Sequence, residues 1–190
     1  MARKVAFEFD PFEMAGIDKS SLDSRLVNEV LSDIQDFVLE SVLSDVAALK
    51  SPVTGRNFKA LQSKEYIAHK KSKGLSPVPN LELDGSMLSS LKVVKKGKNR
   101  LVLTVDDEEG DKADGHNNHS GESKIPERKF IPHEDSGESF RPAIRNGIKD
   151  LVMMAVEKQI DENISDAGED VDLETLVDRG VKVTLRQFED

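Results

Sequence analysis

Two long stretches of the chain repeat apolar residues every three or four positions, which is the spacing of one face of an α-helix. The first, from about residue 21 to 49, carries Leu22, Leu26, Val30, Ile34, Phe37, Val38, Val42, Val46 and Leu49. The second, from about residue 140 to 160, carries Phe140, Ile144, Ile148, Leu151, Val152, Ala155, Val156 and Ile160. Each stretch predicts a long amphipathic helix, and neither helix can bury its apolar face alone.

Helix-capping residues and prolines mark the ends of these helices. Ser20 and Ser21 are candidate caps of the first helix, Ser51-Pro52 ends it, and Pro142 suits the first turn of the second. Ser63 is a candidate cap of a further short helix that stops before Gly74.

Strand patterns lie outside the two helices. Apolar residues alternate in Val5 to Phe12, and two β-rich runs at 87–95 and 100–106 flank a basic turn, which predicts a hairpin. IPERKFIP, residues 125–132, predicts an edge strand or an extended crossing. Near the C-terminus, LETLVDRG predicts a helical turn and VKVTLRQF, residues 181–188, a final strand.

These elements predict an α+β fold, in which two long amphipathic helices pack on one side of a small, mostly antiparallel sheet. We expect an N-terminal arm or strand over residues 1–20, a core over 21–160, and an acidic extension with a short helix and strand over 161–190. Residues 106–124, DDEEGDKADGHNNHSGESK, predict a long exposed loop. Because this loop and the acidic extension are so polar, we expect both to contact other subunits or proteins.

Composition excludes several classes of function. The chain has no cysteine, so disulfides, thiolate metal sites and thiol catalysis are excluded. No apolar run is long enough to span a bilayer, and the first residues lack the apolar stretch of a signal peptide, so we expect a protein made in a cytoplasm. Net charge is −6 over residues 1–49, +9 over 50–100, −5 over 101–160 and −7 over 161–190. This distribution suits either neighbours of opposite charge or solvated surfaces with a basic loop.

Three histidines invite a metal or nuclease interpretation. His116 and His119 have a spacing that metal ligands use, and His133 follows in the chain. However, the residues around them favour a flexible loop, and no helix is predicted directly after His119. We therefore expect no catalytic residue, cofactor or metal, and keep a metal-dependent nuclease acting through His116 and His119 as the enzymatic alternative.

Four motifs follow the first helix in a characteristic order. They are TGRNFKALQSKEYIAHKKSKG; Leu83, Asp84, Gly85, Met87, Ser90 and Leu91; Ala113, His116 and Gly121; and Ile125, Pro126, Arg128, Phe130 and Ile131. Over residues 22–160, this order resembles the virion-morphogenesis and tail-completion proteins of tailed phages. The chain departs from the family pattern in lacking Tyr before Ala113, in a longer His-to-Gly spacing, and in Lys129 where Pro is common.

The resemblance implies a structural virion protein without enzymatic activity, located in the neck or tail and assembled in the host cytoplasm. Copies would form a hexameric ring that joins tail to head. Its partners would be head connector or adaptor proteins and tail terminator or tube proteins, with genomic DNA passing through the lumen without specific recognition. A tail-terminator ring is the alternative within the same machinery, and a cellular adaptor domain is another.

Five residues of the motifs are candidates for contacts between subunits: Gly85, Met87, His116, Arg128 and Phe130. Gly85 permits a turn that re-aims the chain into the hairpin, although a generic turn explains it equally well. Arg128 and Phe130 lie on a strip that two prolines stiffen, and Arg and aromatic residues often anchor interfaces. A core position for Phe130 is the alternative.

Overall fold

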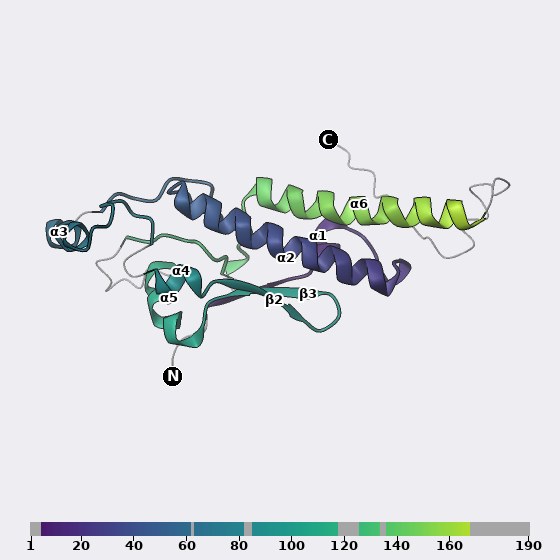
Figure 1. Cartoon of the computed structure of the whole chain (residues 1–190), viewed down its shortest axis with the longest axis horizontal. Coiled ribbons are helices and arrows are strands. Elements are labelled where there is room, and N and C mark those ends of the chain that lie inside the picture. The colour runs from purple at the N-terminus through teal and green to yellow at the C-terminus, as the bar shows by residue number, and fades with distance from the viewer. Residues whose placement is uncertain (1–4, 62, 82–84, 118–125, 134–135, 168–190) are drawn as a thin grey trace.

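A three-stranded antiparallel sheet and two long helices make up the α+β fold that the sequence predicts (Figure 1). The computed structural model describes residues 5–61, 63–81, 85–117, 126–133 and 136–167. With η denoting a 3-10 helix, the elements are β1 (Ala6–Phe9), α1 (Pro11–Ala15), η1 (Lys19–Ser21), α2 (Ser24–Ala47), α3 (Lys64–Ser72), α4 (Ser86–Ser89), β2 (Lys92–Lys96), β3 (Arg100–Thr104), η2 (Asp107–Glu109), α5 (Gly110–Asn117) and α6 (Pro142–Ala167).

The sheet has the order β1-β3-β2, so β3 is central and the N-terminal strand belongs to the core. Phe7 lies opposite Leu103, which in turn lies opposite Val93, and all three are buried. Because side chains alternate along a strand, the residues between them point to the other face. Val94 on that face is 37% exposed. The sheet therefore buries one face, whereas the other face is only partly exposed, since Thr104 on it is buried.

The helix α2 lies between the sheet and α6 (Figure 1). Its apolar stripe is buried at every helical turn, and the buried residues of α6 face it. One continuous core contains these stripes and the inner face of the sheet: Phe7, Phe9, Phe12, Val30, Leu31, Ile34, Val38, Val42, Val46, Val93, Leu101, Leu103, Phe140, Ile144, Ile148 and Val152. The two predicted stripes thus pack as expected.

The caps of the long helices differ from the expected ones. Asp23 caps α2 and accepts a hydrogen bond from Arg25 N at 2.6 Å, whereas Ser20 and Ser21 lie in η1. The expected boundary at residue 160 is wrong, because α6 continues to Ala167. The strand predicted over 181–188 lies outside the described residues. None of the described helices is long and apolar enough to cross a membrane.

The predicted hairpin is present but shorter than expected. β2 begins at Lys92, and residues 86–89 form the helix α4 instead of strand. Gly85 precedes α4 with φ of +81°, a left-handed conformation that favours glycine. Residues 126–133 contain no strand and run as an extended crossing.

The loop expected over 106–124 is wrong for its first part. Residues 107–117 form η2 and α5, and Ala113 and Asn117 of α5 are buried at 0% and 1% exposure. Ala113 and Asn117 thus form the inward face of α5, which the polar composition of residues 106–124 did not predict. Residues 118–124 lie outside the described part.

The short helix α3 is capped by Ser63 as expected, and it projects from one end of the protein (Figure 1). Its buried side chain is a lysine. The Lys70 ammonium donates to Val78 O at 2.8 Å and to Asn80 Oδ1 at 2.7 Å. These bonds tie the segment after α3 back onto the helix.

Candidate functional site

The described residues of the second, third and fourth motifs gather in one lobe beside the sheet, formed by α4, α5 and the strip of residues 126–132 (Figure 1). Asn117 fastens the strip to α5. Its Oδ1 accepts hydrogen bonds from Phe130 N and Ile131 N, both at 2.9 Å, and its Nδ2 donates to Ile131 O at 2.7 Å. Arg128 N donates to His116 O at 2.7 Å. The last turn of α5 therefore fixes the course of the strip.

Arg128, which is buried, and His116, which is partly exposed, form a polar pair in this lobe. One guanidinium nitrogen lies 3.5 Å from His116 Nδ1, and Arg128 Nε has no hydrogen-bond partner in the described chain. Burial and the adjacent positive charge of Arg128 lower the pKa of His116 to about 4. Burial also lowers the pKa of Arg128. The imidazole is therefore neutral at pH 7 and can accept a hydrogen bond from the guanidinium.

Three of the five interface candidates are covered by the chain itself. Met87, Arg128 and Phe130 are 4%, 3% and 0% exposed, and Phe130 occupies the core position that the sequence left open. In this conformation they shape the lobe from inside and offer no surface to another subunit. Gly85 and His116 are partly exposed.

The described residues do not assemble a metal centre around the histidines. No three His, Cys, Asp or Glu side chains within the described ranges are placed to hold one ion. His119 lies outside those ranges. The Arg128 guanidinium beside His116 opposes a cation at that ring.

Both outer strands of the sheet have an edge that no strand of the described chain pairs with. The β2 edge lies against α2, where Gln35 Nε2 donates to Val93 O at 2.8 Å. Lysines 92, 95 and 96 also lie on β2. Lysine on an edge strand disfavours pairing of that edge with another chain. The β2 edge is thus partly protected.

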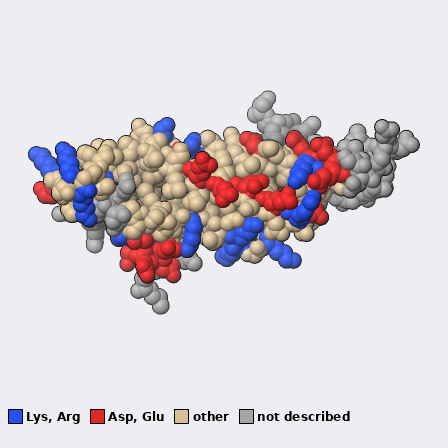
Figure 2. Space-filling model, viewed as in Figure 1, with Lys and Arg blue, Asp and Glu red and all other residues tan. Residues whose placement is uncertain are grey.

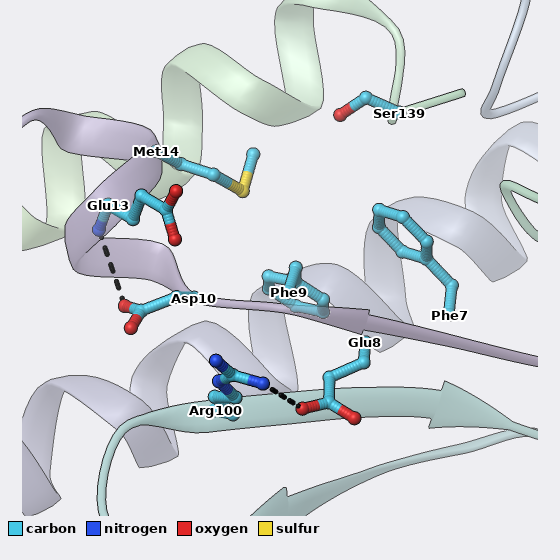
Figure 3. Close-up of a pocket in the computed structure, with 8 residues that line it drawn as sticks. All are labelled: Phe7, Glu8, Phe9, Asp10, Glu13, Met14, Arg100 and Ser139. Atoms are coloured by element: carbon cyan, nitrogen blue, oxygen red, sulfur yellow. Dashed lines mark hydrogen bonds and ion pairs between the residues drawn. The ribbon is translucent and has the colours of Figure 1, made fainter. Parts of the chain in front are cut away.

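The β1 edge instead borders an open groove with a volume of about 480 Å³. Figure 3 shows the groove between β1, α1 and the segment leading into α6. Its lining combines aromatic and thioether side chains with three carboxylates, one guanidinium and one hydroxyl: Phe7, Phe9, Met14, Glu8, Asp10, Glu13, Arg100 and Ser139. An apolar floor beside a free backbone edge suits an extended peptide.

Fixed charges surround this edge. Glu8 accepts hydrogen bonds from Lys96 and, at 2.8 Å, from Arg100, and these bonds lower the pKa of its carboxyl. Asp10 caps α1 by accepting from Phe12 N at 3.0 Å. The described chain provides no ion-pair partner for Glu13. Lys19 lies 3.7 Å from Asp10, and Glu8 is paired with Lys96 and Arg100, so two of the three carboxylates of the groove have cationic partners.

The chain matches no protein-family model, no curated protein and no solved structure.

Charge of each sign gathers on separate parts of the surface. Figure 2 shows Lys and Arg at the end formed by α3, and a row of Asp and Glu along α2. The row on α2 contains Glu29, Asp33, Asp36 and Glu40, all exposed. Like charges at this spacing disfavour an isolated helix, and Glu29 of the row is paired with Lys158 at 3.1 Å.

Sequence reasoning missed Asn117 and the groove. Asn117 looked like part of a solvated loop, and only the buried Ala113 four residues earlier hints at an inward face. The groove joins β1 to Ser139 across 130 residues of sequence. The alternation of Phe7, Glu8 and Phe9 was the one available signal.

Proposed function

We propose that this chain is a structural virion protein of a tailed phage, a ring-forming tail-completion protein that joins the tail to the head at the neck. The observation that carries the proposal is the open β1 edge beside its groove. A free edge of this kind either aggregates or binds another chain. A closed ring satisfies the edge of each subunit with its neighbour.

Two further observations support this function. The described residues of the second, third and fourth motifs lie in one lobe, so their order in the sequence corresponds to one structural unit. The separation of the basic α3 end from the acidic row on α2 suits head-to-tail contacts between identical subunits, because complementary patches fix orientation.

In this proposal the ring is hexameric and works by binding alone. Head connector or adaptor proteins contact one side of it, and tail terminator or tube proteins contact the other. Genomic DNA passes through the lumen without specific recognition. With a net charge of −9, the subunit does not favour tight DNA binding that would impede ejection.

Mass photometry of the purified protein, together with its location in purified particles, tests the proposal. We expect a discrete ring of identical subunits, and an antibody against the chain should label the neck. A monomer at all concentrations that is absent from mature particles would contradict the proposal.

The phenotype of a null mutant separates the two roles within the same machine. Tails of normal length that lack heads indicate a completion protein, whereas abnormally long tails indicate a terminator. Incubation of the purified protein with plasmid DNA and divalent metal tests the nuclease alternative. Cleavage that His116→Ala abolishes would overturn the structural assignment.

A further inference from the structure

We propose that Arg128 binds one small oxyanion, a phosphate or a carboxylate, through the side of its guanidinium that meets no acceptor in the described chain. This site goes beyond the proposed virion function and does not depend on it.

Half of the Arg128 guanidinium lacks a hydrogen-bond partner among the described residues. The side chain is 3% exposed, and one of its terminal nitrogens, Nη1, lies 3.5 Å from His116 Nδ1. Nε is buried without a partner, and no described residue accepts a hydrogen bond from Nη2. The N–H bonds of Nε and Nη2 point to the same side of the guanidinium. That side is the fork through which arginine binds a carboxylate or a phosphate with two parallel hydrogen bonds.

The positive charge of Arg128 also lacks a negative partner in the described chain. A buried charge is strongly unfavourable unless an opposite charge and hydrogen bonds replace the water that it has lost. Burial lowers the pKa of Arg128, and among the described groups Tyr66 alone acts in the opposite direction. His116 cannot supply the missing charge, because its ring is neutral at pH 7. An oxyanion at the vacant fork supplies both the charge and the two acceptors.

The surrounding elements position the guanidinium for such a ligand. Arg128 N donates to His116 O at 2.7 Å, so the last turn of α5 holds both the backbone and the Nη1 end of Arg128. Tyr66 on α3 lies near enough to act on the charge of Arg128, and it brings a hydroxyl, which can donate a hydrogen bond to an anion. The site thus joins the strip, α5 and α3.

Burial of Arg128 limits the size of the ligand. Because only 3% of the residue is exposed, access to the fork is narrow. A small free anion suits this access better than a phosphate in the backbone of a nucleic-acid duplex. The bound ion would stabilise the folded protein, since a ligand that binds only the folded state lowers its free energy relative to the unfolded chain.

Titration of the full-length protein with inorganic phosphate tests the site. Sodium chloride keeps the ionic strength constant at pH 7, and NMR follows the Nε–H resonance of Arg128. We expect this resonance to shift and to saturate in the millimolar range. The Tm from circular dichroism should rise with phosphate concentration. A parallel titration with acetate shows whether a planar carboxylate fills the site as well as a tetrahedral phosphate.

Two matched variants locate the binding. Arg128→Lys keeps the positive charge but cannot offer the fork, so the Kd for phosphate should increase at least about tenfold. Arg145→Lys makes the same change at an exposed position on α6 and should leave the titration unchanged. The Nε–H measurement uses the unmodified protein, so it remains decisive even if Arg128→Lys does not fold.

Two outcomes overturn the inference. One is an Nε–H resonance of Arg128 that responds to neither phosphate nor acetate, and the other is equal phosphate binding by the unmodified protein and Arg128→Lys. The site and the virion function fail separately. A protein that binds phosphate but is absent from phage particles contradicts the function alone, and a neck protein whose Arg128 ignores both anions contradicts the site alone.

Discussion

The aromatic ring of Phe37 on α2 lies directly over Gly147 on α6. A methyl group built at Gly147 would stand 2.2 Å from Cζ of Phe37 and 2.8 Å from its Cε1. Such distances are far below van der Waals contact. The missing side chain at residue 147 is therefore what lets the two long helices approach each other at this level.

Replacing Gly147 with alanine should destabilise the protein. In most helix interiors Gly→Ala stabilises by about 1 kcal/mol, but here overpacking against Phe37 should reverse the sign and cost a net 1–2 kcal/mol, roughly. Urea unfolding followed by circular dichroism measures the change. Gly115→Ala on α5 is the matched control, because a methyl there meets nothing within 4 Å. Adding Phe37→Leu should restore much of the loss, and failure to do so would refute the packing argument.

Removing the Asn117 side chain should loosen the lobe. Asn117→Ala leaves the backbone N–H groups of Phe130 and Ile131 and the carbonyl of Ile131 without partners in a buried position, at a cost of about 2–4 kcal/mol. Exposed Asn146→Ala on α6 should change stability by less than about 0.5 kcal/mol. Hydrogen exchange of residues 128–131 should rise in the first variant only. Unchanged exchange there would show that other contacts hold the strip.

The ion pair between Asp45 and Arg141 should be sensitive to conservative change. Arg141 donates to Asp45 through Nε at 2.5 Å and through a terminal nitrogen at 3.0 Å, joining the end of α2 to the start of α6. Because lysine cannot reproduce this fork, Arg141→Lys should cost about 1–3 kcal/mol.

The exposed pair of Arg25 with Glu162, at 3.3 Å, serves as the control. Arg25→Lys should change the free energy of unfolding by less than about 0.5 kcal/mol. If Arg141→Lys and Arg25→Lys changed the free energy of unfolding equally, the two hydrogen bonds from Arg141 to Asp45 would not contribute more than an exposed ion pair.

The free energy of unfolding should decrease as pH falls through a window set by His116. Its pKa is about 4 in the folded protein and near 6.5 in the unfolded chain. Between these values the unfolded chain binds more protons, so the free energy of unfolding rises with pH. The contribution of His116 is full above about pH 6.5 and is lost as pH falls to about 4, with an upper limit of about 3 kcal/mol that partial exposure reduces.

His116→Gln removes the titration and should flatten this part of the pH profile. Urea unfolding at a series of pH values between 4 and 7 measures the slope in both proteins. His69→Gln, at an exposed position on α3, controls for the replacement of a histidine by glutamine. Identical slopes for His116→Gln and the unmodified protein would show that His116 is not the responsible group.

The sequence by itself determined the secondary-structure framework. The apolar residues of α2 and α6 recur at helical spacing, and those of β1 and the hairpin alternate. Such periodicity can be read from the sequence without knowing which elements pack together. Local cap chemistry also identified the start of α3 at Ser63.

Tertiary structure alone decided the interior of the motif lobe and the open edge. The composition of α5 is too polar for its sequence to predict a helix. Its inward side chains, Ala113 and Asn117, are buried, and Asn117 forms hydrogen bonds with Phe130 and Ile131. The groove exists because β1, α1 and the segment before α6 meet in space, and sequence periodicity carries no information about which elements meet. For the same reason the sequence favoured Arg128 as an interface anchor and left Phe130 open between an interface and the core, since only the packing of the strip against α5 buries both.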